Sequence, residues 1–231
     1  MFQTRSLKLE RLDTGDYTAD EYDICLSELR FINRWIGDTW ALRKTLLREI
    51  MQKDLREFSV LDVGAGSGEL LREIAKFARK SERKAKLVGL ELNEISANSI
   101  ATESKDFSEI SAIRGNALQL PFTDNSFDYI ICSLFTHHFT DEKVVQILSE
   151  FRRVSRLGIF VIDLHRHPIA FGLYKVFCTA FRISSLVRED GSLSVLRGFK
   201  PNELKQLAQA AKMENASVTR HFPFRLVLIV V

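Results

Sequence analysis

The stretch 60–70, VLDVGAGSGEL, decides the fold of this chain. Val60 to Val63 form the end of a short strand, and glycine then occupies positions 64, 66 and 68. From Glu69 onward, the apolar residues recur at a spacing typical of a helix. A strand, a bare turn and a helix in this order predict the first unit of a doubly wound α/β sheet, whose ligands bind at the carboxyl ends of the strands.

The glycine turn itself has the chemistry of a binding loop. Glycines can take positive φ and let a ligand approach the backbone, and free N–H groups at the start of the next helix favour a carboxylate or phosphate. A plain tight turn is the alternative. A dinucleotide fingerprint, G-x-G-x-x-G, requires glycine at position 69, where this chain has Glu69. A nucleotide-dependent oxidoreductase is therefore the weaker hypothesis.

The sequence downstream repeats the alternation of strand and helix. Helices are predicted at 69–79, 94–104 and 141–154, and strands at 58–63, 86–92, 110–115, 127–134, 157–164, 216–222 and 224–231. Strands separated by helices predict parallel pairing, and the last two strands are close enough to form an antiparallel hairpin. We therefore expect an α/β fold with a Rossmann-like, seven-stranded, mostly parallel sheet in three αβα layers.

Two further regions are distinguished by their patterns. Residues 1–57 predict a helical extension or cap, with two helices between 20 and 54 that break near Gly37 and Asp38. Residues 58–231 form the predicted core. Within it, the insert 166–199 is rich in apolar and aromatic residues whose spacing predicts one amphipathic helix, and a further helix runs from Pro201 through Met213.

Composition limits the class of protein. With 27% charged and 45% hydrophobic residues, the 231-residue chain is a globular protein rather than a disordered one. The net charge is +3 and the basic residues are dispersed, so nucleic-acid binding is not predicted. Three distant cysteines without a C-x-x-C pair indicate free thiols, and no apolar run is long enough to span a bilayer. We expect a cytoplasmic protein.

The second predicted strand ends in Glu91, about 20 residues after the glycine turn. A carboxylate in this position can accept hydrogen bonds from both hydroxyls of a ribose, which nucleotides and nucleosides share. The alternative is a solvated glutamate that starts the next helix together with Asn93. Glu91 and the glycine turn together predict a nucleoside-containing ligand.

Four motifs in order carry a family resemblance: VLDVGAGSG at 60–68, GLELN at 89–93, GNALQLPF at 115–122 and FDYIICSLFTHHF at 127–139. With them, the chain from residue 58 onward resembles the class I S-adenosylmethionine-dependent methyltransferases. It is most similar to their small-molecule branch, which includes the ubiquinone and menaquinone biosynthesis methyltransferases. The resemblance implies S-adenosylmethionine as cofactor and S-adenosylhomocysteine as product.

The resemblance also implies which residues bind the cofactor. Asp62 and the turn would hold the methionine part, Glu91 the ribose, and the GNAL segment and Leu92 the adenine, with Ser133 near the methyl group. These predicted cofactor residues are Asp62, Gly64, Ala65, Gly66, Gly68, Glu91, Leu92, Asn116, Ala117, Leu118 and Ser133. Asn116 stands where the family often has an acidic residue, and its amide oxygen can still accept a hydrogen bond.

Histidines gather at the predicted active-site edge. His137 and His138 follow the fourth predicted strand, and His165 and His167 follow the fifth. Imidazole is a suitable base at neutral pH. We expect His138 and His165, with His137, to act as bases or to orient the acceptor, although ordinary loop histidines and catalysis by positioning alone remain alternatives.

The residues after the fourth strand narrow the reaction further. CSLF replaces the Pro-Pro-aromatic run typical of nucleobase amine methylation, and Ser133 stands near the position where magnesium-dependent relatives place an aspartate. A metal-independent reaction is therefore predicted, with Asp163 as the one unpaired candidate ligand.

The acceptor is predicted from aromatic residues. Phe135, Trp35, Phe171 and Tyr174 are expected to close an oily pocket, since the family covers its substrate with a segment after the fifth strand. Core packing and contact with a membrane surface are the alternatives. We expect methyl transfer to an oxygen or carbon of a small, lipophilic aromatic, quinone or polyketide-like acceptor. A regulatory protein that binds the cofactor without transfer is the second hypothesis, and the oligomeric state stays open.

Overall fold

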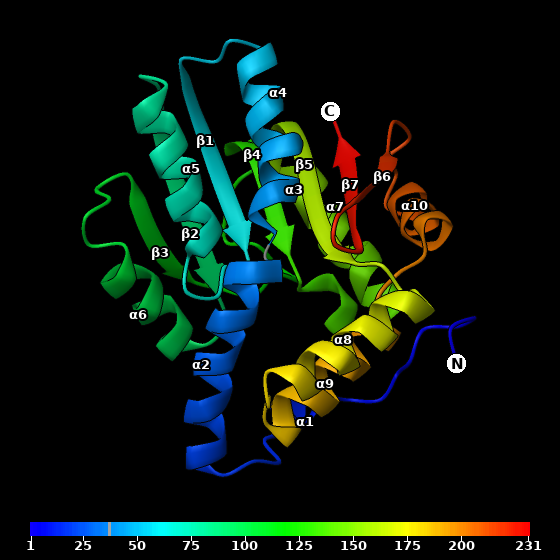
Figure 1. The fold of residues 1–231 in the computed structure, drawn as a ribbon. Coiled ribbons are helices and arrows are strands. Elements are labelled where there is room, and N and C mark those ends of the chain that lie inside the picture. Colours follow the sequence, from blue (N-terminus) through cyan, green and yellow to red (C-terminus); the bar gives the residue numbers. More distant parts are fainter. Residues whose placement is uncertain (37) are drawn as a thin grey trace.

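The computed structural model describes residues 1–36 and 38–231, apart from the side chains at positions 22, 23, 26, 30 and 33–36. The chain is built around one sheet of seven strands (Figure 1). The strands are β1 (Glu57–Val63), β2 (Lys84–Glu91), β3 (Ile110–Arg114), β4 (Phe127–Ser133), β5 (Ser155–Leu164), β6 (Ser217–His221) and β7 (Arg225–Val230).

The strand order is β3-β2-β1-β4-β5-β7-β6. β1 to β5 pair in parallel, and β7 runs antiparallel to both β5 and β6. The predicted fold class, with its antiparallel hairpin at the end of the chain, is confirmed. The order reverses between β1 and β4, and such a switch point opens a crevice at the carboxyl ends of the strands.

Helices cover both faces of the sheet because its central strands are apolar on both sides. On one face lie α3 (Thr39–Lys44), α4 (Leu46–Gln52), α5 (Glu69–Lys80) and α6 (Glu94–Glu103), and on the other lie α7 (Asp141–Val154) and α10 (Pro201–Ala210). In β1, Val60 packs toward α4 and α5, whereas Leu61 and Val63 pack toward α7 and α10. Such burial on both faces is typical of parallel strands.

A third group of helices lies beyond the carboxyl ends of the strands (Figure 1). It consists of α1 (Arg11–Thr14), α2 (Ala19–Ile36), α8 (Pro168–Ala180) and α9 (Ser185–Arg197), together with the short 3-10 turn η1 (Thr136–His138). Buried residues of α2, α8 and α9 form a small hydrophobic cluster of their own. The predicted cap is therefore present, and it places both the N-terminal region and the insert above the sheet edge.

The insert differs from the expectation. It forms two helices instead of one, because the chain turns at Arg182, whose φ is +53°, before α9 starts. Such a left-handed residue ends a helix. α10 ends at Ala210, earlier than predicted, and Thr45 divides the second N-terminal helix into α3 and α4. The predicted break at Gly37 lies outside the described residues.

Two other sequence expectations concern the whole chain. Cys25, Cys132 and Cys178 are free and buried. Among the described residues, no helix has the length and apolar character needed to cross a membrane. The division of the chain at residue 57 stays a prediction, and α3 and α4 contribute Leu42 and Ile50 to the core beneath the sheet.

Candidate active site

Two cavities adjoin at the carboxyl edge of the sheet. One, of about 230 Å³, lies beside the glycine turn, and the other, of about 560 Å³, lies under the cap helices. Leu134, which directly follows β4, lines both. Its φ of +49° places it in the left-handed region, which is unusual for a leucine. A group bound in one cavity therefore lies next to a group bound in the other.

The smaller cavity is built on the glycine turn. Gly66 N donates to Glu91 Oε1 over 2.6 Å, which ties the turn to the end of β2. At Gly64, with φ +72°, an added Cβ would lie 2.5 Å from the ring of Phe135. At Gly66, with φ +57°, an added Cβ would meet no atom of the described residues within 4 Å. Because Gly64 has no side chain, the ring of Phe135 can lie against the turn. Because Gly66 has none, the space beside its backbone stays open.

A buried carboxyl group lies at the bottom of this cavity. Asp62 is 1% exposed, and its Oδ1 has no hydrogen-bond partner among the described residues. Burial, and then the charge of Glu91, raise the pKa of Asp62 to about 8. Because an unpaired buried carboxylate is costly, this oxygen is suited to a positively charged donor.

The N-terminal helices close the same cavity. Asp38 and Thr39 line it, and the carboxylate of Asp38 accepts a hydrogen bond from Ser133 Oγ and pairs with Arg225. This arrangement joins the segment before α3 to the ends of β4 and β7. Nothing in the sequence pattern around Asp38 indicated that it lies at the site.

The larger cavity is mostly apolar, and its walls come from distant parts of the chain. Its lining includes Leu12, Cys25, Leu29 and Ile32 from the N-terminal helices, Ala170, Leu173, Tyr174, Phe177, Val187 and Val195 from α8 and α9, and Phe222, Pro223 and Phe224 from the final hairpin. His137, His138 and His165 lie in the same wall. The volume is typical of a site for a small organic ligand.

His137 and Asp163 form a buried pair in this wall. The Nδ1 atom of His137 lies 2.7 Å from Asp163 Oδ1, and the two residues are 3% and 0% exposed. Burial opposes ionisation of Asp163, but His137 and hydrogen bonds from Thr136 and Leu164 outweigh it and lower its pKa to about 2. The ionised carboxylate only accepts, so Nδ1 of His137 donates and Nε2 carries no proton while the ring is neutral. The expectation that Asp163 is unpaired was wrong.

The other two predicted bases have different surroundings. His138 Nδ1 lies 3.3 Å from Asp13 Oδ1, at the start of the chain. For His165, burial lowers the pKa to about 4, so its imidazole is neutral near pH 7. In the described part of the chain, neither side chain has a buried carboxylate partner at hydrogen-bond distance like Asp163, and their roles stay predictions.

Comparison with known proteins indicates the family that this chain resembles. The family described as "Methyltransferase domain" matches residues 60–158. A demethylmenaquinone methyltransferase of Bacillus cereus (strain B4264) is 29% identical over 231 residues, covering 91% of this chain and 90% of the relative. The ubiquinone/menaquinone biosynthesis C-methyltransferase UbiE of Rickettsia prowazekii (strain Madrid E) is 34% identical over 132 residues, covering 55% of this chain and 52% of the relative.

The solved structures agree on the fold. The plantazolicin methyltransferase BamL, in complex with a substrate analogue and SAH, superposes with a TM-score of 0.64 at 18% identity, covering 83% of this chain and 69% of that one. In several of the curated matches, the chain spans about half the length of the relative. These comparisons support a class I S-adenosylmethionine-dependent methyltransferase. S-adenosylmethionine is the methyl donor of this family.

The residues of the chain fit S-adenosylmethionine. The unpartnered Oδ1 of Asp62 is suited to the ammonium group of the methionine part, and the open space at Gly66 leaves room for it. Glu91, at the end of β2, lies where a ribose is bound in doubly wound sheets. A Cβ at Gly66 would project into this space.

The remaining predicted cofactor and acceptor residues differ in their surroundings. Leu92 is 65% exposed, Ala117 is buried, and Asn116 Oδ1 accepts from Leu118 N over 2.9 Å. Ser133 lines the smaller cavity and Tyr174 the larger one. These positions do not test the predicted cofactor roles, which stay predictions. The side-chain oxygen of Asn116 already accepts a hydrogen bond within its own loop.

The predicted acceptor residues are only partly brought together. Phe135 packs over Gly64 and against Phe139, and Phe171 packs against Phe2, so neither lines the larger cavity. The side chain of Trp35 lies outside the described residues. Sequence reasoning missed Glu10, Leu134 and Phe224, which do line the cavity. Of these three residues, only Leu134 could have been predicted from the sequence, because it directly follows the fourth predicted strand.

Proposed function

We propose that this chain transfers the methyl group of S-adenosylmethionine to a ring carbon of a lipophilic, hydroxylated aromatic acceptor of the quinol class. One observation carries the proposal: a polar cavity at the glycine turn and an apolar cavity containing the His137–Asp163 pair share Leu134. The quinone-biosynthesis names of relatives in B. cereus and R. prowazekii support the acceptor class.

The chain's residues bind and orient the donor in this proposal. S-adenosylmethionine supplies a methyl group on a positively charged sulfur, ready for in-line displacement. Asp62 would accept from the ammonium group, the backbone of the turn at Gly64 and Gly66 would face the carboxylate, and Glu91 would hold the ribose hydroxyls. Holding both reactants in line supplies much of the rate enhancement.

The His137–Asp163 pair acts on the acceptor. His137 lines the apolar cavity and keeps Nε2 unprotonated, because Nδ1 donates to Asp163. Nε2 takes the proton of an acceptor hydroxyl, and Asp163 stabilises the imidazolium that forms. The electron-rich ring carbon can then take the methyl group of a bound donor, whose sulfur would leave with the electrons of its carbon bond. The ring carbon afterwards loses its own proton to water, and the ring oxygen takes back the proton held by His137. No metal takes part.

Two arginines hold the turn that carries this histidine. Arg5 and Arg197 both donate to the carbonyl oxygen of His137 over 3.2 Å, and Arg197 also donates to that of His138 over 2.6 Å. Arg197 is 3% exposed and comes from α9, in the insert. The cap therefore positions the base as well as enclosing the acceptor.

A labelling experiment tests the proposal. The purified chain is incubated with methyl-labelled S-adenosylmethionine and a prenylated 1,4-naphthohydroquinone under anaerobic conditions. We expect label on a ring carbon of the product, identified by carbon NMR. The matched control is the 1,4-dimethoxy analogue, which has no hydroxyl proton for His137 to take and is expected to stay unlabelled.

Other products would contradict parts of the proposal. Label on oxygen would refute transfer to carbon. Calorimetric binding of S-adenosylmethionine without transfer to any hydroxylated aromatic compound would instead favour the regulatory, cofactor-binding alternative. Contact with a membrane surface also stays a prediction, which the exposed Ile169, Leu173 and Val176 of α8 support.

A further inference from the structure

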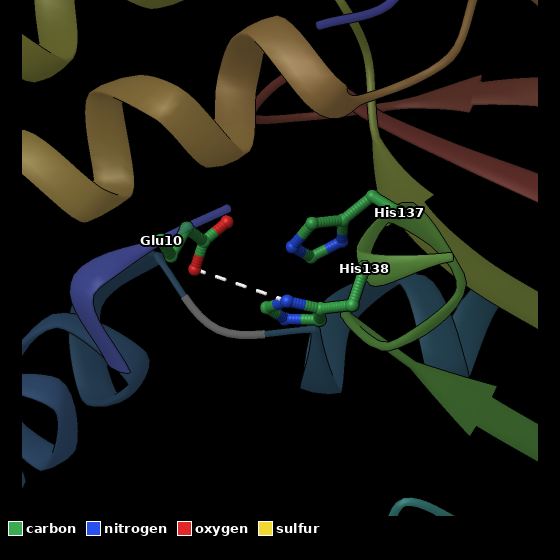
Figure 2. A group of neighbouring side chains, drawn as sticks. All are labelled: Glu10, His137 and His138. Carbon is green, nitrogen blue, oxygen red and sulfur yellow. Dashed lines mark ion pairs between the residues drawn. The ribbon is translucent and has the colours of Figure 1, made fainter. Parts of the chain in front are cut away.

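We propose that Glu10, His137 and His138 form a binding site for a divalent transition-metal ion, and that Zn²⁺ bound there stops methyl transfer by occupying Nε2 of His137. The three side chains lie together at the wall of the acceptor cavity (Figure 2). One potential ligand atom from each lies within 4.8 Å of the others. The second half of the proposal rests on the proposed function, in which His137 is the base.

The surroundings leave one ring nitrogen of each imidazole available for such a role. Asp163 accepts from Nδ1 of His137, which leaves Nε2 as the free ligand atom. A carboxylate behind a histidine in this way is the usual second partner of a metal-bound imidazole. His138 Nδ1 lies 3.9 Å from Glu10 Oε2 and 3.3 Å from Asp13 Oδ1, yet it has no hydrogen-bond partner among the described residues.

The charges of the cluster favour a divalent cation. Glu10, Asp13 and Asp163 supply three carboxylates, and Arg197 pairs with the first two of them at 3.7 and 2.6 Å. Three carboxyl groups therefore face one guanidinium group. Glu10 and Asp163 are 3% and 0% exposed, and buried carboxylates require compensation. A divalent cation would provide it.

The ligand types select the metal. Two imidazoles and one carboxylate form a common open site for Zn²⁺ and for Fe²⁺, whereas Mg²⁺ and Ca²⁺ prefer oxygen ligands throughout. Bonds of about 2.1 Å at tetrahedral angles place ligand atoms roughly 3.4 Å apart, so the cluster must close slightly. The side chain of His138 is 30% exposed and has room for this movement. The fourth position faces the acceptor cavity.

The proposed metal site and the proposed general base use the same atom, so metal binding and proton transfer exclude each other. Nε2 of His137 can hold either a metal ion or the proton of the acceptor. A bound ion also fills the wall against which the acceptor hydroxyl must lie. Loading the site therefore lowers the rate of transfer, while leaving the cofactor cavity beyond Leu134 unchanged.

Direct metal binding is the first test. The full chain, without a polyhistidine tag and stripped with EDTA, is titrated with Zn²⁺ by calorimetry and with Co²⁺ by visible absorption, in the absence of cofactor and acceptor. We expect one ion per chain. Glu10→Gln and His138→Gln, on separate segments, should each weaken binding at least tenfold, and His165→Gln, in the same cavity, should keep the parent affinity. Thermal melting checks that each variant is folded.

Activity is the second test. Zn²⁺ should inhibit transfer by the parent chain, with recovery in EDTA, and Glu10→Gln should need at least tenfold more Zn²⁺ for the same inhibition. The site is refuted by a lack of saturable one-to-one binding, or by binding that survives in both variants. Binding without inhibition refutes the link to His137. If Zn²⁺ binds as expected but the EDTA-treated parent shows no transfer, the proposed function fails and the site stands.

Discussion

The cofactor side and the acceptor side of the crevice are built in different ways. The cofactor cavity takes most of its lining from one short stretch, Asp62 to Leu70, and the rest from Asp38, Thr39, Ser133 and Leu134. The acceptor cavity takes its lining from two distant parts of the chain, residues 10–32 and 134–225. The first cavity is therefore built chiefly on a local motif at the sheet edge. The second exists only once the cap has packed, so changes on the two sides should have separable effects.

The largest effect is expected from a substitution that slows methyl transfer and leaves cofactor binding unchanged. In Asp163→Asn, the amide no longer fixes the proton on Nδ1 of His137 and cannot stabilise an imidazolium. Transfer should fall by about 10²–10⁴-fold, the usual contribution of general base catalysis. Single-turnover rates measure the loss, and calorimetry should show unchanged affinity for S-adenosylmethionine. An equal loss of both would contradict the separation of the two sides.

The converse change acts on the cofactor side. Gly64→Val places a branched side chain at φ +72° against the ring of Phe135, which lies 2.5 Å from the added Cβ position. Backbone strain and the steric clash should cost about 3 kcal/mol of stability and at least tenfold in cofactor affinity. Denaturant unfolding and calorimetry measure the two losses. The control is Gly172→Ala in α8, where an added Cβ meets nothing within 4 Å and should have little effect.

The pH dependence of stability tests whether the buried carboxyl group of Asp62 lacks a partner. The pKa of Asp62 is about 8 in the folded chain against 3.8 ordinarily, so the folded state holds a proton that the unfolded state has lost between these values. Stability of the cofactor-free chain therefore falls as pH rises from about 4 to 8. Asp62→Asn removes this loss, and we expect the variant to gain about 2–4 kcal/mol relative to the parent between pH 5 and 8.

Urea unfolding of both proteins across this pH range measures the difference. Saturating S-adenosylmethionine should reduce it, because the ammonium group would compensate the carboxylate in the parent chain alone. If the difference in unfolding free energy between the two proteins were the same at every pH, Asp62 would be ionised throughout the range. That result would contradict the absence of a partner for its Oδ1.

The smallest effect is expected within the cap. Tyr174→Phe removes the hydroxyl that donates to the carbonyl of Val187 over 2.7 Å and leaves the ring in the cavity wall. We expect a loss of about 1 kcal/mol in stability, as for an ordinary hydrogen bond, and a small rise in KM for the acceptor. Affinity for the cofactor should not change. A loss of cofactor binding would show that the two sides are coupled through α8 and α9.

The sequence predicted the fold more fully than it predicted the site. The strands from 58 to 134 and the helices at 69–79 and 141–154 followed from periodicity, because each of these elements carries its own apolar pattern along the chain. The two-helix insert was missed, since the broad apolar pattern of α8 gave no signal of the turn at Arg182. The sequence could not show which histidine pairs with Asp163, because His137 is 26 positions away from it.

The sequence by itself determined the sheet and the glycine turn, and the family resemblance of its four motifs implied the cofactor. Those features depend on local conformational preference and on the alternation of apolar residues, both of which are written along the chain. Only the tertiary structure decided that Asp163 orients His137, that Glu10 meets the two histidines, and that Arg197 holds their turn. These contacts join the first residues to the insert and to the ends of β4 and β5. They depend on how the cap packs over the sheet edge, and no short stretch of sequence encodes that packing.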